Sequence, residues 1–99
     1  MSSNEVLVTF EKENVDFGEA IRALKEGKRV CRKGWNGKDQ YLELGKDISY
    51  TNLKGDSAVA YHEDIGSQAI VFCGTRGHQM GWLASQSDML AEDWCILQN

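Results

Sequence analysis

The sequence predicts an α+β fold in which one amphipathic helix packs on a twisted antiparallel sheet of five or six strands. Three observations lead to this prediction. Apolar residues recur with helical spacing in one short segment, several other runs are rich in β-branched and aromatic residues, and glycine-containing turns separate those runs. With 99 residues, 41% hydrophobic and 26% charged and without proline, the chain is expected to form a single globular domain over residues 1–99.

The clearest element is a helix from about Phe17 to Glu26. Asp16 precedes it as the N-cap, Glu19 follows three residues later as the capping partner, and Gly27 stands where the helix would end. Its apolar stripe has the spacing i, i+3, i+4, i+7 and consists of Phe17, Ala20, Ile21 and Leu24. A helix with one apolar face needs a flat partner, which a sheet supplies.

Six short runs have strand character, and two turns join some of them. The Asn36-Gly37 pair predicts a tight hairpin with Trp35 at its turn, and residues 74–78 predict a second hairpin between 69–73 and 79–83. The runs are Val6 to Phe10, Arg29 to Arg32, Gln40 to Leu44, Ala58 to His62, Gln68 to Cys73, and Trp94 to Leu97.

Three further segments complete the prediction. Residues 45–56 carry turn residues with little periodicity and are expected to form a loop. Residues 85–88 have helix-start chemistry, so Met89 to Glu92 are expected to form about one helical turn, with Leu83, Met89, Leu90 and Trp94 given to the core. Residues 1–15 form an N-terminal extension that is a candidate for an added strand.

The charge distribution favours a small anionic partner. Between Lys25 and Lys38 there are six basic residues and one acidic residue, a local excess of +5, in a chain whose net charge is -4. The acidic remainder would repel a long nucleic-acid backbone, so a nucleic-acid polymer is not expected as a partner. A domain of this size has little room for a deep private pocket, which favours a ligand enclosed between subunits.

Other classes of function find little support in the sequence. No apolar run approaches the roughly 18 residues of a membrane span, and the N-terminus has no leader pattern, so a cytoplasmic location is expected. The three cysteines, at 31, 73 and 95, are expected to be reduced, half-buried strand residues. Cys73 and His78 span one predicted hairpin without two further ligands, and His62 has no partner at metal-site spacing, so no metal, no cofactor and no catalytic set are expected.

The candidate binding residues come from two tryptophan-centred segments. In the first, Trp35 would stack on a purine while Arg32 and Lys33 hold phosphate oxygens, with glycines allowing close approach of the ligand. In the second, Trp82 adds an aromatic face, Gln86 could bind a base edge, and Asp88 is equally a ribose acceptor or a helix cap. The bland alternative for Trp35 is an aromatic that covers the edge of the core.

Taken together, these segments resemble one known family. Phe17-Gly18-Glu19-Ala20-Ile21, Arg32-Lys33-Gly34-Trp35-Asn36-Gly37-Lys38, and the run from Trp82 to Trp94 resemble the small phage and prophage family of Thoeris anti-defence sponge proteins in order, spacing and identity. The match covers roughly residues 17–44 and 82–97. The resemblance assigns candidate pocket positions in both tryptophan-centred segments, and Phe17, Arg32 and Lys33 are added to them. The full set of candidate binding residues is Phe17, Arg32, Lys33, Trp35, Asn36, Gly37, Trp82, Ser85, Gln86 and Asp88.

The resemblance implies a homo-oligomer, a tetramer by analogy, in the cytoplasm of the infected bacterial host. Such proteins capture a cyclic ADP-ribose isomer made by bacterial immune enzymes and hold it without cleaving it, and some relatives also take up cyclic oligonucleotides. Two other classes stay open for this chain: an enzyme that degrades the same signal, and a phage interaction or structural module that binds no nucleotide.

Three departures from the family pattern limit what the resemblance implies. Residues 1–15 precede the usual start, and residues 45–81 match little, so ligand preference transfers least. Gly81 stands where many relatives have proline before the tryptophan, and a looser strand end is expected there.

Overall fold

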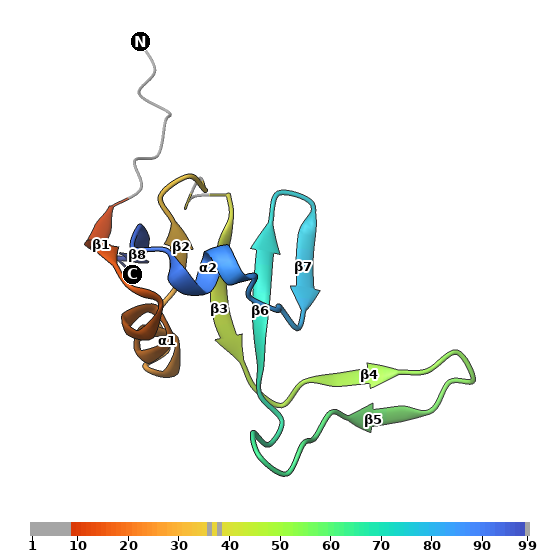
Figure 1. The fold of residues 1–99 in the computed structure, drawn as a ribbon. Helices are drawn as coiled ribbons and strands as arrows, with labels where there is room; N and C mark the ends of the chain where they lie inside the picture. Colours follow the sequence, from red (N-terminus) through yellow and green to blue (C-terminus); the bar gives the residue numbers. More distant parts are fainter. Residues whose placement is uncertain (1–8, 36, 38, 99) are drawn as a thin grey trace.

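The computed structural model describes residues 9–35, 37 and 39–98. The predicted fold class is confirmed: α1 lies against a six-stranded, all-antiparallel sheet with the strand order β1-β8-β2-β3-β6-β7 (Figure 1). The elements are β1 (Phe10–Val15), α1 (Phe17–Lys25), β2 (Val30–Arg32), β3 (Tyr41–Gly45), β4 (Ser49–Thr51), β5 (Ser57–Val59), β6 (Ala69–Gly74), β7 (Gly77–Met80), α2 (Gln86–Leu90) and β8 (Trp94–Leu97).

The predicted helix forms with the predicted ends. The Asp16 side chain accepts a hydrogen bond from the Glu19 backbone N–H at 2.8 Å, and Gly27 follows the last turn with φ of +86°, a conformation that favours glycine. The Glu19 carboxylate accepts a hydrogen bond from Lys12 Nζ at 2.7 Å, which ties the start of α1 to β1. This contact holds the start of α1 beside the edge strand β1, while its apolar face packs on the interior strands.

The two faces of the sheet carry different cores. Residues that face α1 form the larger core, and the opposite face holds a smaller one made of Cys31, Cys95 and Leu97. Cys31 and Cys95 are register partners on β2 and β8, and burial raises the pKa of the Cys31 thiol to about 12. The three cysteines are free and fully buried, deeper than expected. The larger core contains Ala20, Ala23, Leu24, Val30, Leu42, Trp94 and Ile96.

The expected loop at 45–56 is wrong in part, because it contains β4, which pairs with β5. Strand β5 overlaps the strand expected from Ala58 to His62. All six residues of the two strands are exposed, so the pair lacks the buried face that produces sequence periodicity. In Figure 1 this hairpin extends away from the six-stranded sheet. Residues 6–8 of the first predicted strand lie outside the described residues, and the strand that the structure describes in the N-terminal extension is β1.

The second helix begins earlier than predicted, and its apolar residues are not core. Leu83 is 92% exposed, Met89 50% and Leu90 72%, so assigning them to the core was wrong. The helix spans only five residues and has no buried residue. Within the described ranges, neither helix is long and apolar enough to cross a membrane.

Gly81 adopts a backbone conformation that proline cannot. Its φ is +90°, and its N–H donates a hydrogen bond to the Ile70 carbonyl oxygen at 3.0 Å. Proline fixes φ near about −65° and has no N–H. The expected looser strand end is therefore not what the structure has, since Gly81 is held to β6 and turns the chain toward Trp82.

Gly37 is buried against the smaller core and leaves no room for a side chain. A Cβ there would lie 3.0 Å from Cys31 Sγ, 3.3 Å from a Leu97 methyl and 3.4 Å from the Phe10 ring. Gly37→Ala should lower the free energy of unfolding by about 1–3 kcal/mol through overpacking. Gly34→Ala is the matched control because nothing lies within 4 Å of its Cβ. Chemical denaturation measures both, and equal effects would contradict this packing.

Candidate functional site

Three tryptophans meet beside the sheet and form what we call the tryptophan cluster: Trp35, Trp82 and Trp94. The Trp94 ring centroid lies 5.5 Å from that of Trp35 and 6.2 Å from that of Trp82, and the centroids of Trp35 and Trp82 are also 6.2 Å apart. Interplanar angles of 74° to 84° make every contact edge-to-face, the arrangement that the aromatic quadrupole favours. Segments 47 residues apart in sequence, at Trp35 and Trp82, are thereby brought together.

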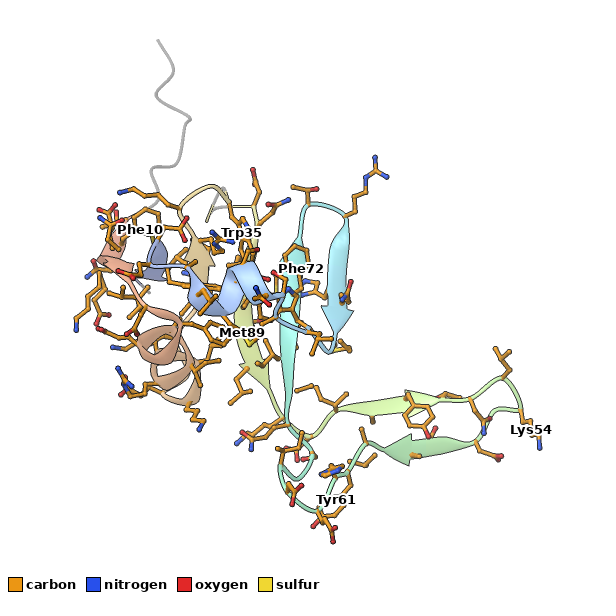
Figure 2. The ribbon with its side chains drawn as sticks, in the orientation of Figure 1. Phe10, Trp35, Lys54, Tyr61, Phe72 and Met89 are labelled. Carbon is orange, nitrogen blue, oxygen red and sulfur yellow. The ribbon has the colours of Figure 1, made fainter. Side chains whose placement is uncertain are left out.

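Two phenylalanines extend the tryptophan cluster. Phe17, at the start of α1, lies 5.4 Å from the Trp94 ring, and Phe72 of β6 lies 5.8 Å from the Trp35 ring. Figure 2 shows Trp35 next to Phe72, with Met89 on α2 nearby. Trp94 is fully buried, whereas Trp35 and Trp82 are only partly buried. The cluster thus has a sealed centre and two indoles that reach the surface.

The segment around Trp35 is a turn, as predicted, but a longer one than a two-residue hairpin. The Trp35 N–H donates to the Arg32 carbonyl oxygen at 2.9 Å, and residues 33–40 separate β2 from β3. Asn36 lies outside the described residues. Gly37 packs against the smaller core, so the structure gives it a packing role, and its predicted contact with a ligand stays a prediction.

A capping box begins α2 and connects it to the tryptophan cluster. Ser85 Oγ accepts from the Asp88 N–H at 3.1 Å, and the Asp88 carboxylate accepts from the Ser85 N–H at 2.9 Å. Trp94 Nε1 donates to the Asp88 carbonyl oxygen at 2.9 Å. The predicted polar residues Ser85 and Gln86 are exposed, and they follow Trp82 by three and four positions.

Arg32 links α2 to β8 through two carboxylates. Its Nη1 lies 3.1 Å from Asp88 Oδ1, and its Nε lies 3.0 Å from Asp93 Oδ1. Burial alone would raise the pKa of Asp88, but hydrogen bonds from Ser85 and from Arg32 outweigh it and lower that pKa. The cap assignment for Asp88 is confirmed, while its predicted ribose contact and the phosphate contact of Arg32 stay predictions.

The local basic excess seen in the sequence is partly balanced in the fold. Lys28 Nζ lies 2.9 Å from a Glu11 carboxylate oxygen, and Lys33 Nζ lies 3.4 Å from Glu13. Counting charge along the chain missed these acids because β1 reaches the basic segment only through the sheet. Ion pairs therefore offset part of the excess counted along the sequence, and the candidate phosphate contact Lys33 is shared with β1.

The tryptophan cluster lines none of the four hollows that can be described on the surface of the chain. Hollows of about 320 to 390 Å³ lie elsewhere on the described surface. One lies between β1 and α1, one at the β6–β7 turn, and two beside the end of α1 and β3. Neither Trp35 nor Trp82 lines any of these four.

A second polar cluster, which sequence reasoning missed, contains Glu43, Cys73 and His78. Cys73 Sγ lies 3.2 Å from His78 Nδ1 and 3.6 Å from Glu43 Oε2. The sequence placed Cys73 and His78 on one hairpin, but Glu43 arrives from β3, 30 positions away. Burial raises the pKa of the Cys73 thiol, which makes it a poor nucleophile at neutral pH.

Lowering the pH should weaken the Arg32–Asp88 ion pair, and the Asp88→Asn variant tests this. Because the folded-state pKa of Asp88 is lowered, its contribution to stability is present above the unfolded pKa and is lost as pH falls through the folded value. Asp88→Ala should cost about 1–3 kcal/mol at neutral pH, and Asp88→Asn, which keeps an acceptor oxygen, should cost less. Denaturation from neutral pH into the acid range should show the gap between wild type and Asp88→Asn shrinking, and a constant gap would contradict the assignment.

Comparisons with known proteins identify the family of this chain. The family model of the Thoeris anti-defense 2-like domain matches residues 15–97. The protein called Thoeris anti-defense 2, from Bacillus phage SP01, is 39% identical over 90 residues, which cover 87% of this chain and 98% of that relative. The predicted family is confirmed, and this membership supports an anti-defence role: the chain belongs to the Thoeris anti-defense 2-like family.

Proposed function

We propose that this protein captures a compact signalling nucleotide of the cyclic ADP-ribose type and holds it intact, which deprives a bacterial immune effector of its signal. The observation that carries this proposal is the meeting of two partly exposed indoles, Trp35 and Trp82, which pack side by side against the larger core. Exposed aromatic faces are suited to stacking on a base. Membership in an anti-defense family supports the biological setting.

Polar groups suited to the rest of such a ligand follow the aromatic face in sequence. Ser85 and Gln86 are exposed hydroxyl and amide groups at the start of α2, and an amide can both donate to and accept from a base edge. The Arg32 guanidinium has five N–H donors, of which the described carboxylate contacts use two. Its remaining donors and the Lys33 ammonium are the proposed partners of phosphate oxygens.

The magnitudes are sufficient for capture. Stacking contributes roughly 1–3 kcal/mol per base, and a hydrogen bond to a charged group roughly 1.5–3 kcal/mol. Two aromatic faces with three or four such bonds can exceed an association cost of about 4–15 kcal/mol. Net binding of about −8 to −12 kcal/mol, micromolar to nanomolar, is then attainable. A capturing protein holds its ligand without turnover, so capture requires an affinity near the nanomolar end of that range.

A second copy of the chain is the proposed wall that closes the site. Trp35 and Trp82 line none of the four described hollows, and residues 80–90 around Trp82 expose four large apolar side chains: Met80, Leu83, Met89 and Leu90. Apolar residues gathered in one short segment are typical of surfaces that another chain covers. We therefore place a homo-oligomer, with the tetramer favoured, at this segment.

One observation favours an enzyme as the second candidate: the contact between Cys73 Sγ and His78 Nδ1 at 3.2 Å. The raised pKa of the buried thiol argues against it. Heating a protein–nucleotide complex and analysing the released small molecule by mass spectrometry separates the two. Capture predicts an intact nucleotide, hydrolysis predicts a degraded one, and a module that binds no nucleotide gives no uptake.

Trp35→Leu should weaken calorimetric binding of cyclic ADP-ribose isomers by about 5- to 150-fold, since one stack is worth about 1–3 kcal/mol. Leucine keeps apolar volume where Trp35 supports two other tryptophans, so it tests stacking with less loss of packing than alanine. Tyr50→Leu is the matched control, because it removes an exposed aromatic from β4. Unchanged affinity in a folded Trp35→Leu protein would rule out stacking by Trp35.

Leu83→Glu should dissociate the oligomer and weaken nucleotide binding together, because it places a charge in the proposed subunit contact. Leu53→Glu is the control, since Leu53 is fully exposed in the turn between β4 and β5. Sedimentation equilibrium gives the mass and calorimetry gives the affinity. A Leu83→Glu protein that keeps both the wild-type mass and the wild-type affinity would refute the proposed contact.

A further inference from the structure

The cluster of Glu43, Cys73 and His78 lies on one face of three neighbouring strands. Cys73 is the register partner of His78 on β7 and of Tyr41 on β3. Glu43 is two positions from Tyr41, and residues two apart in a strand share a face. Three different ligand types, a thiol, an imidazole and a carboxylate, therefore converge with all three ligand atoms within 4.8 Å of one another.

Without a metal, the side-chain contacts described between these three residues are two weak hydrogen bonds to sulfur. A thiol has one proton, and its sulfur lies 3.6 Å from Glu43 Oε2 and 3.2 Å from His78 Nδ1. If the proton goes to the carboxylate, the imidazole must turn its own N–H toward a weak sulfur acceptor. A cation at the centre would satisfy the sulfur, the nitrogen and the oxygen at once.

The spacing between the sulfur and the carboxylate oxygen fits zinc. With Zn–S of about 2.3 Å and Zn–N or Zn–O of about 2.0–2.2 Å, tetrahedral angles put sulfur about 3.6 Å from each of the other two ligand atoms. The Cys73–Glu43 distance of 3.6 Å already matches. The Cys73–His78 distance of 3.2 Å needs a small outward shift of His78, which is exposed and free of core packing.

We propose that Glu43, Cys73 and His78 bind one Zn²⁺, with the fourth position open to water on the His78 side. Binding replaces the thiol proton, which leaves to solvent, so the site holds a thiolate, a carboxylate and a neutral imidazole around the ion. The two negative ligands balance the charge of the metal. The soft sulfur and borderline nitrogen disfavour Mg²⁺ and Ca²⁺, which take oxygen ligands.

Such an ion would join β3, β6 and β7 through one residue from each strand. The β7 strand is an edge of the sheet, and all four of its residues are exposed. It leads directly through Gly81 to Trp82. The zinc site would therefore fix β7, the strand that precedes Trp82 of the proposed nucleotide site. The two proposals rest on different residues, and the zinc site does not depend on nucleotide binding.

Titration of metal-free protein with Co²⁺ tests the site, because a cobalt–thiolate bond gives a near-ultraviolet charge-transfer band. The wild type should bind one equivalent with that band, and Zn²⁺ should displace it. His78→Gln should weaken Co²⁺ binding at least about 10-fold, and Cys73→Ser should abolish the band. Should Cys73→Ser fail to fold, the exposed His78 variant carries the test.

His62→Gln is the matched control, since His62 is the other histidine of the chain and is also exposed. It should bind Co²⁺ as the wild type does. No charge-transfer band in the wild type, or an unchanged affinity in His78→Gln, would overturn the proposal. Calorimetry with nucleotide on the same metal-free protein reads out the nucleotide site separately, so failure of one proposal is distinguishable from failure of the other.

Discussion

The indole of Trp94 is the contact on which the rest of the structure depends. It is fully buried in β8, its ring touches Phe17, Trp35 and Trp82, and its N–H bonds to the carbonyl oxygen of Asp88. One side chain thus joins α1, the β2–β3 turn, the segment after β7 and α2. Because a buried indole N–H without a partner is costly, the position of α2 is fixed along with the ring.

The sequence predicted those features whose signals are local. Helix α1 was found because Asp16, Glu19 and Gly27 mark its ends, and Trp35 and Trp82 were found because each stands in a distinctive short motif. The exposure of Leu83 and Leu90 was missed, since an apolar residue after a capping box normally faces the core. Strand β4 was missed because it has no buried face to give it a period of two, whereas β5 overlaps the strand that was expected from Ala58 to His62.

Long-range pairing explains the remaining differences. The basic segment is partly neutralised by Glu11 and Glu13, which only the β1–β8–β2 order brings near it. Glu43 joins Cys73 and His78 because β3 pairs with β6 in a register that no local motif reveals. Long-range contacts also explain the position of Arg32. The carboxylates of Asp88 and Asp93 orient this side chain, which the sequence analysis assigned to phosphate. The tryptophan cluster thus lies beside the ion pairs by which Arg32 joins α2 to β8. A second copy of the chain is proposed to enclose it.

The chain has three tryptophans, and their indole N–H signals in a ¹⁵N-labelled sample test the central claim directly. On addition of a cyclic ADP-ribose isomer, the account predicts large shifts for Trp35 and Trp82, with intermolecular contacts to base protons, and a smaller shift for Trp94, which stays bonded to Asp88. Saturating ligand that leaves the Trp35 and Trp82 signals unmoved would contradict it.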